Sequence, residues 1–271
     1  MEQTNNNKSL IESNNDEYIL PHEKKFLDDI SKNGRFILSI GSKGSGKTYL
    51  MMAVLKYCLQ NNIYEAIHFV CPSYEGEQNN SYDFIKNQKH IQIYQRYNEG
   101  VSKKVDISRR KKKTLFLLDD ASGELLYNID ATLIQLITTT RHFKGCTIYL
   151  ACHSCKRILT SIIRQNVDSL FIYKIINMKL LNDLYDEYFS QFKDKFKDFK
   201  SSYLIWTKEK YSCIHFSLHD EGIDVNVKNW NILKNQIEGF KPTQALKTIT
   251  AKKPEETNKN SIRFIFSKRR Y

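Results

Sequence analysis

The stretch Gly41-Ser42-Lys43-Gly44-Ser45-Gly46-Lys47-Thr48 matches the pattern G-x-x-x-x-G-K-[ST] at every fixed position. The apolar residues 36–40 precede it and are typical of a short strand, and the apolar residues 49–59 that follow it are typical of a buried helix. Strand, glycine-rich loop and helix in this order characterise phosphate-binding loops. The sequence therefore predicts an α/β domain with an anion site at this turn.

The residue types of the loop suit a bound triphosphate. Glycine has no Cβ, so Gly41, Gly44 and Gly46 let the backbone bend tightly and approach a phosphate closely. The backbone N–H groups and the positive end of the helix dipole then face the phosphates. We expect Lys47 to reach the β- and γ-phosphates and the Thr48 hydroxyl to bind Mg²⁺. The expected nucleotide-binding residues are Gly41, Ser42, Lys43, Gly44, Ser45, Gly46, Lys47 and Thr48.

Basic residues outnumber acidic ones in this chain. Its 271 residues include 42 lysines and arginines against 30 aspartates and glutamates, which gives a formal net charge of +12. This surplus favours an acidic partner, with nucleic acid as the leading candidate, although surplus lysine can also serve solubility alone. No stretch approaches the roughly 20 apolar residues of a membrane span, and residues 1–17 lack the features of a signal peptide. We therefore expect an intracellular protein without a membrane span.

The six cysteines lie mostly within apolar segments, which indicates buried thiols in a reducing compartment. Cys152 and Cys155 form a C-x-x-C pair, but the chain has no second pair at the spacing of a zinc finger. The sequence therefore argues against a metal site at this pair.

Apolar segments separated by helical or polar segments predict the fold class. Near-continuous apolar strands that alternate with helices are typical of a mostly parallel sheet with helices on both faces. Two further apolar runs flank a polar turn and predict a hairpin at the sheet edge. Strands are expected at 35–40, 66–71, 114–120, 146–152 and 169–175, a short strand at 91–94, helices at 131–140 and 179–200, a loop with a short helix at 154–166, and the hairpin strands at 203–206 and 213–216.

We expect one catalytic domain over residues 21–240. Residues 1–20 are predicted to be disordered or loosely attached, and residues 241–271 are predicted to form a flexible basic tail. Residues 73–113 are polar and give weak structural signals. They end in the basic run 109–113, which suits phosphate contacts, a solvated turn or a localisation signal.

Two carboxylates end the strand predicted at 114–120. Hydrolysis of a nucleotide needs one carboxylate for Mg²⁺ and another for the attacking water. In a parallel sheet this strand can lie beside the strand at 35–40, with its carboxyl end at the phosphate site. We therefore assign Asp119 to Mg²⁺ and Asp120 to the water, with Glu124 as a possible substitute for Asp120.

Other polar residues are candidates for contacts with the γ-phosphate. His153 and Ser154 follow the strand at 146–152, and either could hydrogen-bond the γ-phosphate or the lytic water, while a purely structural role for His153 is an equal alternative. Arg141 and Arg164 are candidates for an arginine supplied across a subunit interface, although each could be an ordinary surface arginine.

Four segments in a fixed order carry a family resemblance. They are the glycine loop, LFLLDDAS at 115–122, TTRHFKGCTIYLACHS at 139–154 and IIRQNVDSLFIY at 162–173. This order resembles that of the genome-packaging ATPases of poxviruses, other nucleocytoplasmic large DNA viruses and virophages, which belong to the FtsK–HerA group of P-loop motor ATPases. The matching positions are Asp119-Asp120, Arg141-His142, His153 and Arg164-x-Asn166. The family usually has Gln at the position of His153, and many relatives have Glu at the position of Asp120.

The resemblance, which covers about residues 34–176, implies a P-loop NTPase fold of the ASCE or RecA-like class with Walker A and Walker B motifs. It implies an ATPase that uses ATP and Mg²⁺ to move double-stranded DNA into a preformed capsid. Relatives act as homo-oligomeric rings, pentamers or hexamers, so the implied partners are DNA, further copies of the chain and a capsid protein. The implied location is the host cytoplasm or viral factory, or the virion. Two alternatives stay open: a nucleoside or small-molecule kinase, and a slow NTP-binding assembly switch.

Overall fold

The computed structural model describes residues 27–74, 82–85, 88–120, 125, 129–153, 161–190, 196–217 and 224–229. The predicted terminal segments 1–20 and 241–271 lie outside these residues, as do Glu124, Ser154 and Cys155. The predicted limits of the catalytic domain therefore stay predictions.

An eight-stranded sheet organises the described residues, in the order β3-β2-β4-β5-β1-β6-β7-β8. The first six strands in this order are parallel, and β7 and β8 run antiparallel to their neighbours. The strands are β1 (Phe36–Ile40), β2 (Ala66–Val70), β3 (Ile91–Tyr94), β4 (Thr114–Asp119), β5 (Cys146–Cys152), β6 (Ser169–Tyr173), β7 (Ser212–Ser217) and β8 (Asp224–Asn229).

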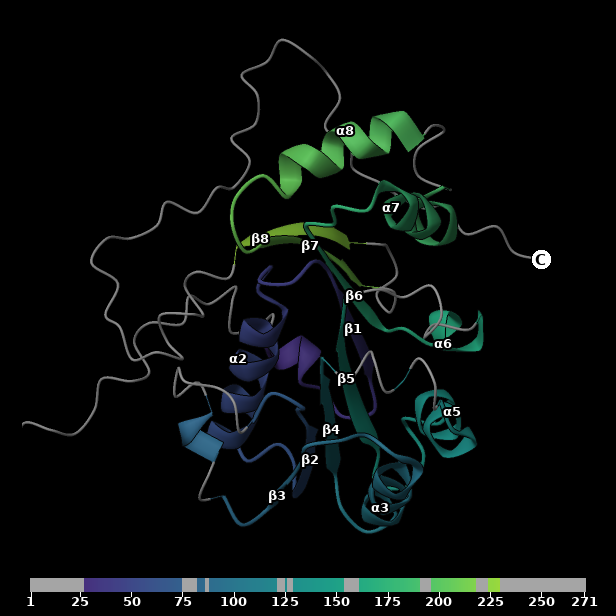
Figure 1. Ribbon diagram of the computed structural model, residues 1–271. Helices are drawn as coiled ribbons and strands as arrows, with labels where there is room; N and C mark the ends of the chain where they lie inside the picture. The colour runs from purple at the N-terminus through teal and green to yellow at the C-terminus, as the bar shows by residue number, and fades with distance from the viewer. Residues whose placement is uncertain are drawn as a thin grey trace, which may run out of the picture.

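Helices cover both faces of this sheet (Figure 1), as the sequence predicted. Helix α2 lies on one side, and α3, α5 and α6 lie on the other, while α7 and α8 lie next to the antiparallel strands. The helices are α2 (Lys47–Gln60), α3 (Glu99–Arg109), α5 (Ala131–Thr138), α6 (Ser161–Gln165), α7 (Met178–Leu184) and α8 (Phe196–Trp206), with a 3-10 turn η2 (Asp83–Ile85) and a π-helical turn η3 (Tyr185–Phe189).

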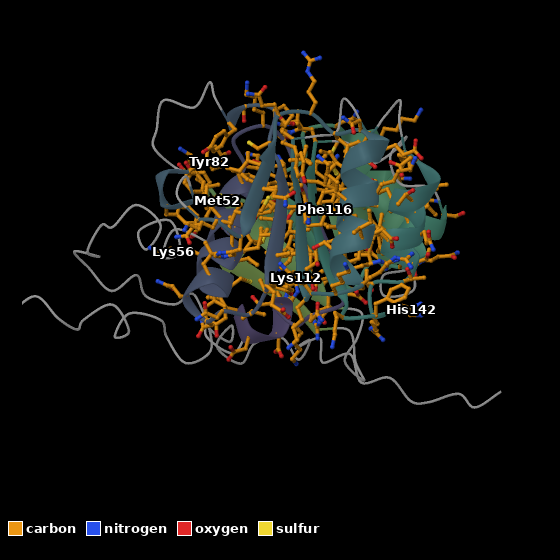
Figure 2. The ribbon with its side chains drawn as sticks, turned by 90° about the horizontal axis from the view of Figure 1, so that it is seen from below. Met52, Lys56, Tyr82, Lys112, Phe116 and His142 are labelled. Atoms are coloured by element: carbon orange, nitrogen blue, oxygen red, sulfur yellow. The ribbon has the colours of Figure 1, made fainter. Side chains whose placement is uncertain are left out.

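The strands contribute alternate residues to two hydrophobic cores, because successive side chains of a strand point to opposite faces. In β4, Phe116 and Leu118 pack toward α3 and α5, while Leu115 and Leu117 pack toward α2. Figure 2 shows Phe116 at the centre of the molecule, with Met52 of α2 on one side of the sheet. Five of the six cysteines are described; all five are buried thiols outside disulfides, as the sequence predicted.

The edge hairpin exists, but its first predicted strand is wrong. Residues 203–206 form the last turn of α8, and the hairpin consists of β7 and β8 instead. Phe199 and Tyr203 of α8 are four residues apart and both buried, which is helical spacing. The prediction failed because a short apolar run does not distinguish a strand from a buried helix. The helix predicted at 179–200 is also divided, into α7, η3 and the beginning of α8.

Two further findings correct the sequence analysis. Strand β4 does not lie beside β1, because β5 lies between them and pairs with both. The helix α3 was not predicted, since the residues of its segment are mostly polar. Its amino terminus carries a clear cap, however: the Asn98 side chain accepts a hydrogen bond from the N–H of Val101.

Candidate nucleotide site

The glycine loop lies at the carboxyl end of β1, between the ends of β5 and β6. The Gly41 N–H donates to the carbonyl of Cys152, and the Ser42 N–H donates to the carbonyl of Lys174. A Cβ on Gly41 would lie 2.5 Å from the Cβ of Tyr173, which is too close for any side chain. Gly44 has φ +70°, the left-handed region that glycine adopts most readily. The glycines are therefore required by packing and by backbone conformation.

Helix α2 begins where the loop ends, and its amino terminus is suited to an anion. Gly46 is the N-cap residue, so no side chain caps the first N–H groups, and the first turn contains no acidic residue. Uncapped N–H groups and the helix dipole together attract negative charge. A phosphate in the loop would supply the missing acceptors.

The ammonium of Lys47 lies at the centre of the loop. Its Nζ donates to the carbonyl oxygens of Gly41 at 2.8 Å and Ser42 at 2.9 Å, and it lies 3.2 Å from Nδ1 of His153. Burial lowers the pKa of Lys47, and the nearby Asp119 and Asp120 act in the opposite direction. Nδ1 of His153 also lies 3.2 Å from the Gly41 carbonyl oxygen, so it accepts from Lys47 in one tautomer and donates to Gly41 in the other.

Asp119, the last residue of β4, is buried beside the loop. The Thr48 hydroxyl donates to its Oδ1 at 3.1 Å, and the Tyr82 hydroxyl donates to its Oδ2 at 3.4 Å. Burial raises the pKa of Asp119 to about 6, although the bond from Thr48 and the charge of Lys47 oppose the shift. The Thr48 and Asp119 oxygens are hard ligands of the kind that Mg²⁺ prefers, and a cation would offset the burial of this carboxylate. The residues present therefore fit a Mg²⁺ ion.

Asp120 and His153 meet at the ends of β4 and β5. His153 Nε2 lies 2.9 Å from Oδ1 of Asp120 and donates to this carboxylate when Nε2 carries a proton. Asp120 has φ +50°, a backbone conformation that Asp and Asn adopt more readily than other residues with a Cβ. Because β5 lies between β1 and β4, His153 can contact both the loop and the acidic pair.

The two predicted arginines lie elsewhere in the fold. Arg141 forms an ion pair with Asp168 at 3.5 Å, and the other carboxylate oxygen of Asp168 accepts from the Phe36 N–H, at the amino-terminal end of β1. This end is opposite to the phosphate loop. Arg164 in α6 pairs with Glu187 at 3.0 Å. Arg141 could therefore act on a nucleotide only in a neighbouring subunit.

The structure divides the basic run 109–113 into residues with different roles. Arg109 is fully buried and donates to the carbonyl and hydroxyl of Thr139, and it pairs with Asp106 at 2.8 Å. Arg110 pairs with the same carboxylate at 2.7 Å and lies over the ring of Phe143. Lys111 and Lys112 line a separate hollow. Arg109 is therefore structural, whereas Arg110 and the lysines that follow it are exposed.

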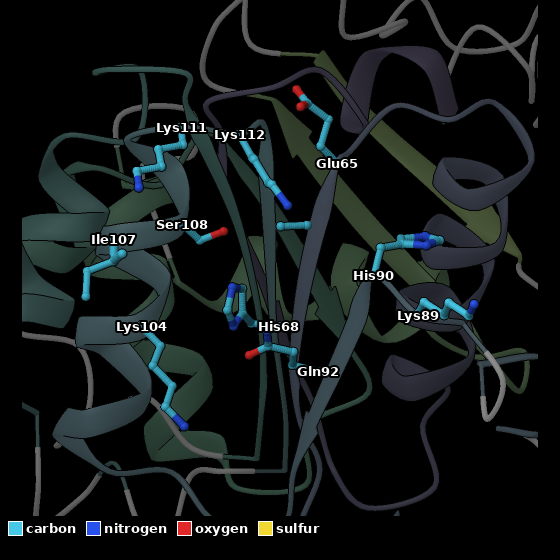
Figure 3. Close-up of a pocket in the computed structure, with 11 residues that line it drawn as sticks. Glu65, His68, Lys89, His90, Gln92, Lys104, Ile107, Ser108, Lys111 and Lys112 are labelled. Atoms are coloured by element: carbon cyan, nitrogen blue, oxygen red, sulfur yellow. The ribbon is translucent and has the colours of Figure 1, made fainter.

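This hollow lies over the amino-terminal ends of β2 and β3 and has a volume of about 610 Å³ (Figure 3). Its floor includes His68 and Gln92, and α3 forms one wall. Burial and the nearby Lys104 lower the pKa of His68 to about 4, so the floor is neutral at pH 7. Four lysines surround it, and among the described residues none of the four has an ion-pair partner: Lys89, Lys104, Lys111 and Lys112.

The sequence analysis missed three tyrosines around the loop. Tyr82 contacts Asp119, Tyr173 packs against Gly41, and Tyr211 packs against Gly46. No motif marks them, because each comes from a segment distant in sequence. Tyr82 lies within the polar segment 73–113, and Tyr211 directly precedes β7.

Two structural searches concern membranes and metals. Among the helices of the residues listed above as described, none combines the length and apolar character that crossing a bilayer requires. The same residues contain no group of three or more His, Cys, Asp or Glu side chains placed to hold a metal ion. A Mg²⁺ ion at Asp119 would therefore depend on phosphate oxygens and water for most of its ligands, which is usual at nucleotide sites.

The fold is similar to that of solved packaging ATPases. No protein-family model and no curated protein matches the sequence. The structure of B204, the DNA-packaging ATPase from Sulfolobus turreted icosahedral virus, superposes with a TM-score of 0.53 at 16% identity, over 73% of this chain and 98% of that chain. The genome-packaging NTPase B204 of Sulfolobus turreted icosahedral virus 2 in complex with AMPPCP gives 0.53 at 17% identity, over 73% and 100%. Its complex with ATP-γS gives 0.52 at 16% identity, over 73% and 99%.

At these identities the similarity establishes the fold. The chain has the α/β fold of P-loop NTPases, and the resemblance to viral packaging ATPases that its motifs indicated is confirmed at the level of the fold.

Proposed function

We propose that this chain is a Mg²⁺-dependent ATPase that moves double-stranded DNA, as a genome-packaging motor does. The observation that carries the proposal is the convergence of Lys47, Thr48, Asp119, Asp120 and His153 on the glycine loop, from the ends of three neighbouring strands. A loop alone binds phosphate, whereas an ordered acid–imidazole pair beside it provides groups for hydrolysis.

Each residue has a role in this proposal. The loop N–H groups and Lys47 bind the β- and γ-phosphates, and Lys47 exchanges its contacts with the loop carbonyls for phosphate oxygens. Thr48 and Asp119 hold Mg²⁺, which would neutralise charge on the phosphates as it develops. Tyr82 fixes the second oxygen of Asp119. Of these residues, only Tyr82 was not predicted from the sequence.

Asp120 and His153 act on the lytic water. Asp120 is half-exposed at the mouth of the site and can accept the proton of a water molecule that attacks the γ-phosphate. His153 donates Nε2–H to Asp120 and thereby holds the carboxylate in place, in contact with Lys47 on its other nitrogen. His153 therefore connects the group that binds phosphate to the group that activates water.

The basic hollow supports DNA as the partner. Lysines without acidic partners suit contacts with phosphates, which hold DNA without regard to its sequence. The net charge of +12 favours the same partner. In this proposal, copies of the chain form a ring, pentameric or hexameric, around DNA and load a preformed capsid in an infected cell. Arg141 or Arg164 of one subunit would then stabilise transition-state charge in the next.

Phosphate release from Mg·ATP, measured with and without duplex DNA, tests this function. We expect hydrolysis that duplex DNA stimulates. Transfer of phosphate to a nucleoside would indicate a kinase instead, and tight nucleotide binding with negligible turnover would indicate a switch. For the ring, mixing inactive Lys47→Ala with inactive Arg141→Ala or Arg164→Ala subunits should restore activity for the arginine that acts across the interface. No recovery with either arginine variant would rule out both assignments.

A further inference from the structure

Aromatic rings line the side of the phosphate loop that faces away from Asp119 and His153. A Cβ placed on Gly46 would lie 3.1 Å from Cδ1 of Tyr211 and 3.4 Å from Cε1 of Tyr173. Tyr173 is fully buried, whereas Tyr211 is half-buried. The ring of Tyr211 therefore lies at the junction of the loop and helix α2.

A second ring and a cation complete this surface. Tyr49, in the first turn of α2, is also half-buried, and its ring centroid lies 5.9 Å from that of Tyr211 at an interplanar angle of 62°. The ammonium of Lys210 lies 4.8 Å from the centroid of the Tyr211 ring. Tyr49 directly follows the loop in sequence, and Lys210 and Tyr211 directly precede β7. Two distant segments thus place polar-tipped aromatic groups at one end of the loop.

The backbone of Tyr211 indicates that its position is enforced. Its φ is +67°, in the left-handed region that aromatic residues rarely adopt. Strained conformations of this kind persist only where the surrounding structure holds them, and they concentrate at ligand sites. A glycine in the turn would form the same backbone without strain, but it would provide no ring.

We infer that Tyr211 and Tyr49 form the surface on which the base of the bound nucleotide packs. The inference rests on the proposed function, because it requires the triphosphate to occupy the loop. With the phosphates at the amino terminus of α2, the rest of the nucleotide must leave the loop along one of its sides. One side carries carboxylates and the other carries the rings. A planar, uncharged base stacks on aromatic faces, and every base has such a face. The surface therefore adds affinity for any nucleoside triphosphate and selects little between bases.

The affinities for two ligands, measured at equilibrium with Mg²⁺ present, test the inference. AMPPCP carries a base, and inorganic tripolyphosphate does not. The test variant is Tyr211→Gly, which removes the ring and suits the positive φ. Loss of one stacking partner is expected to weaken AMPPCP binding about 10- to 100-fold, while tripolyphosphate affinity stays within about twofold. The guanine analogue GMPPCP should lose affinity by the same factor. Tyr211→Phe keeps the ring and should bind like the wild type, and Tyr94→Ala, which removes a half-buried ring at the end of β3, is a control.

The outcomes separate this inference from the proposed function. If Tyr211→Gly binds AMPPCP as tightly as the wild type, the base does not pack on this ring. If the variant loses AMPPCP and tripolyphosphate equally, the ring only supports the loop, and the inference is wrong while the loop keeps its role. If the wild type binds neither ligand, both the inference and the proposed function are wrong.

Discussion

The two sides of the phosphate loop differ in chemistry. On the side of β5 and β4, charged and polar groups contact one another within hydrogen-bonding distance: Lys47 with His153, His153 with Asp120, and Thr48 with Asp119. On the side of β6 and β7, the loop packs against the rings of Tyr173 and Tyr211. The difference suggests a division of labour. In our proposals the polar side carries out hydrolysis, where fixed charges are most effective, and the aromatic side holds the nucleotide.

The largest effect is expected at the residue that serves both sides. Lys47→Ala removes the buried ammonium at the centre of the loop and should weaken binding of both AMPPCP and tripolyphosphate by about 100-fold or more, since buried charge-assisted hydrogen bonds to phosphate are lost. Calorimetric titration measures both affinities. Lys144→Ala, at an exposed lysine beyond the opposite end of β1, is the matched control and should bind normally. Unchanged affinity of Lys47→Ala for both ligands would show that Lys47 does not bind their phosphates.

Asp120→Asn should affect the polar side alone. The amide keeps the shape of the carboxylate but cannot accept a proton, so turnover should fall about 100-fold or more while AMPPCP affinity stays within about threefold. Steady-state phosphate release and binding titrations give the two numbers. Asp198→Asn, on the exposed face of α8, should match the wild type in both. Wild-type turnover in Asp120→Asn would refute the role given to this carboxylate.

Asp119→Asn should stabilise the nucleotide-free protein. The folded pKa of about 6 lies above the ordinary value of 3.8, so the ionised carboxylate destabilises the fold above pH 6, and this cost disappears as pH falls toward 4. At about 1.4 kcal/mol per pH unit, the variant gains up to about 3 kcal/mol near pH 7.5. Chemical denaturation of both proteins at pH 7.5 and pH 4.5 measures this gain, which should shrink at the lower pH. A variant less stable than the wild type at pH 7.5 would show that the hydrogen bonds of Asp119 stabilise the fold by more than the burial of its charge costs.

The smallest effect is expected far from both sides, at the basic hollow. Replacing Lys111 and Lys112 together by alanine should lower DNA affinity severalfold and reduce the salt dependence of log K by about 2, one phosphate contact for each lysine. Hydrolysis without DNA should not change. The control replaces Lys32 and Lys144 instead. An unchanged salt dependence in the Lys111 and Lys112 variant would exclude the hollow as a DNA surface.

The sequence predicted the polar side better than the aromatic side, for physical reasons. A phosphate loop needs glycines and a lysine at fixed spacing, and a carboxylate at a strand end follows from the apolar run before it, so Lys47 and Asp119 could be identified. Tyr211 packs against Gly46 through tertiary structure alone, and no local pattern records such a contact. The roles of all the predicted site residues, Lys47 and Asp119 included, stay predictions, since geometry gives their positions and not their effect on rate.

The fold was predicted in its class but not in its strand order. Apolar segments mark strands, yet nothing in the segment 146–152 indicates that it lies between β1 and β4. That insertion is what brings His153 between Lys47 and Asp120. The strand prediction for residues 203–206 failed for another reason. Tyr203 faces the core from a helix, and its hydroxyl forms hydrogen bonds with the backbone of Tyr173 and Ile175. Four apolar residues do not reveal that periodicity.

The central claim is that Asp119, at the end of β4, holds the Mg²⁺ of a triphosphate bound in the loop. Single-turnover hydrolysis of Mg·ATP tests it most directly. The wild type and Asp119→Asn are compared with protein in excess over nucleotide. The wild type should release phosphate at least about 100-fold faster than the variant, because the neutral amide oxygen binds Mg²⁺ more weakly than the carboxylate that it replaces. Equal rates in the two proteins would contradict the account.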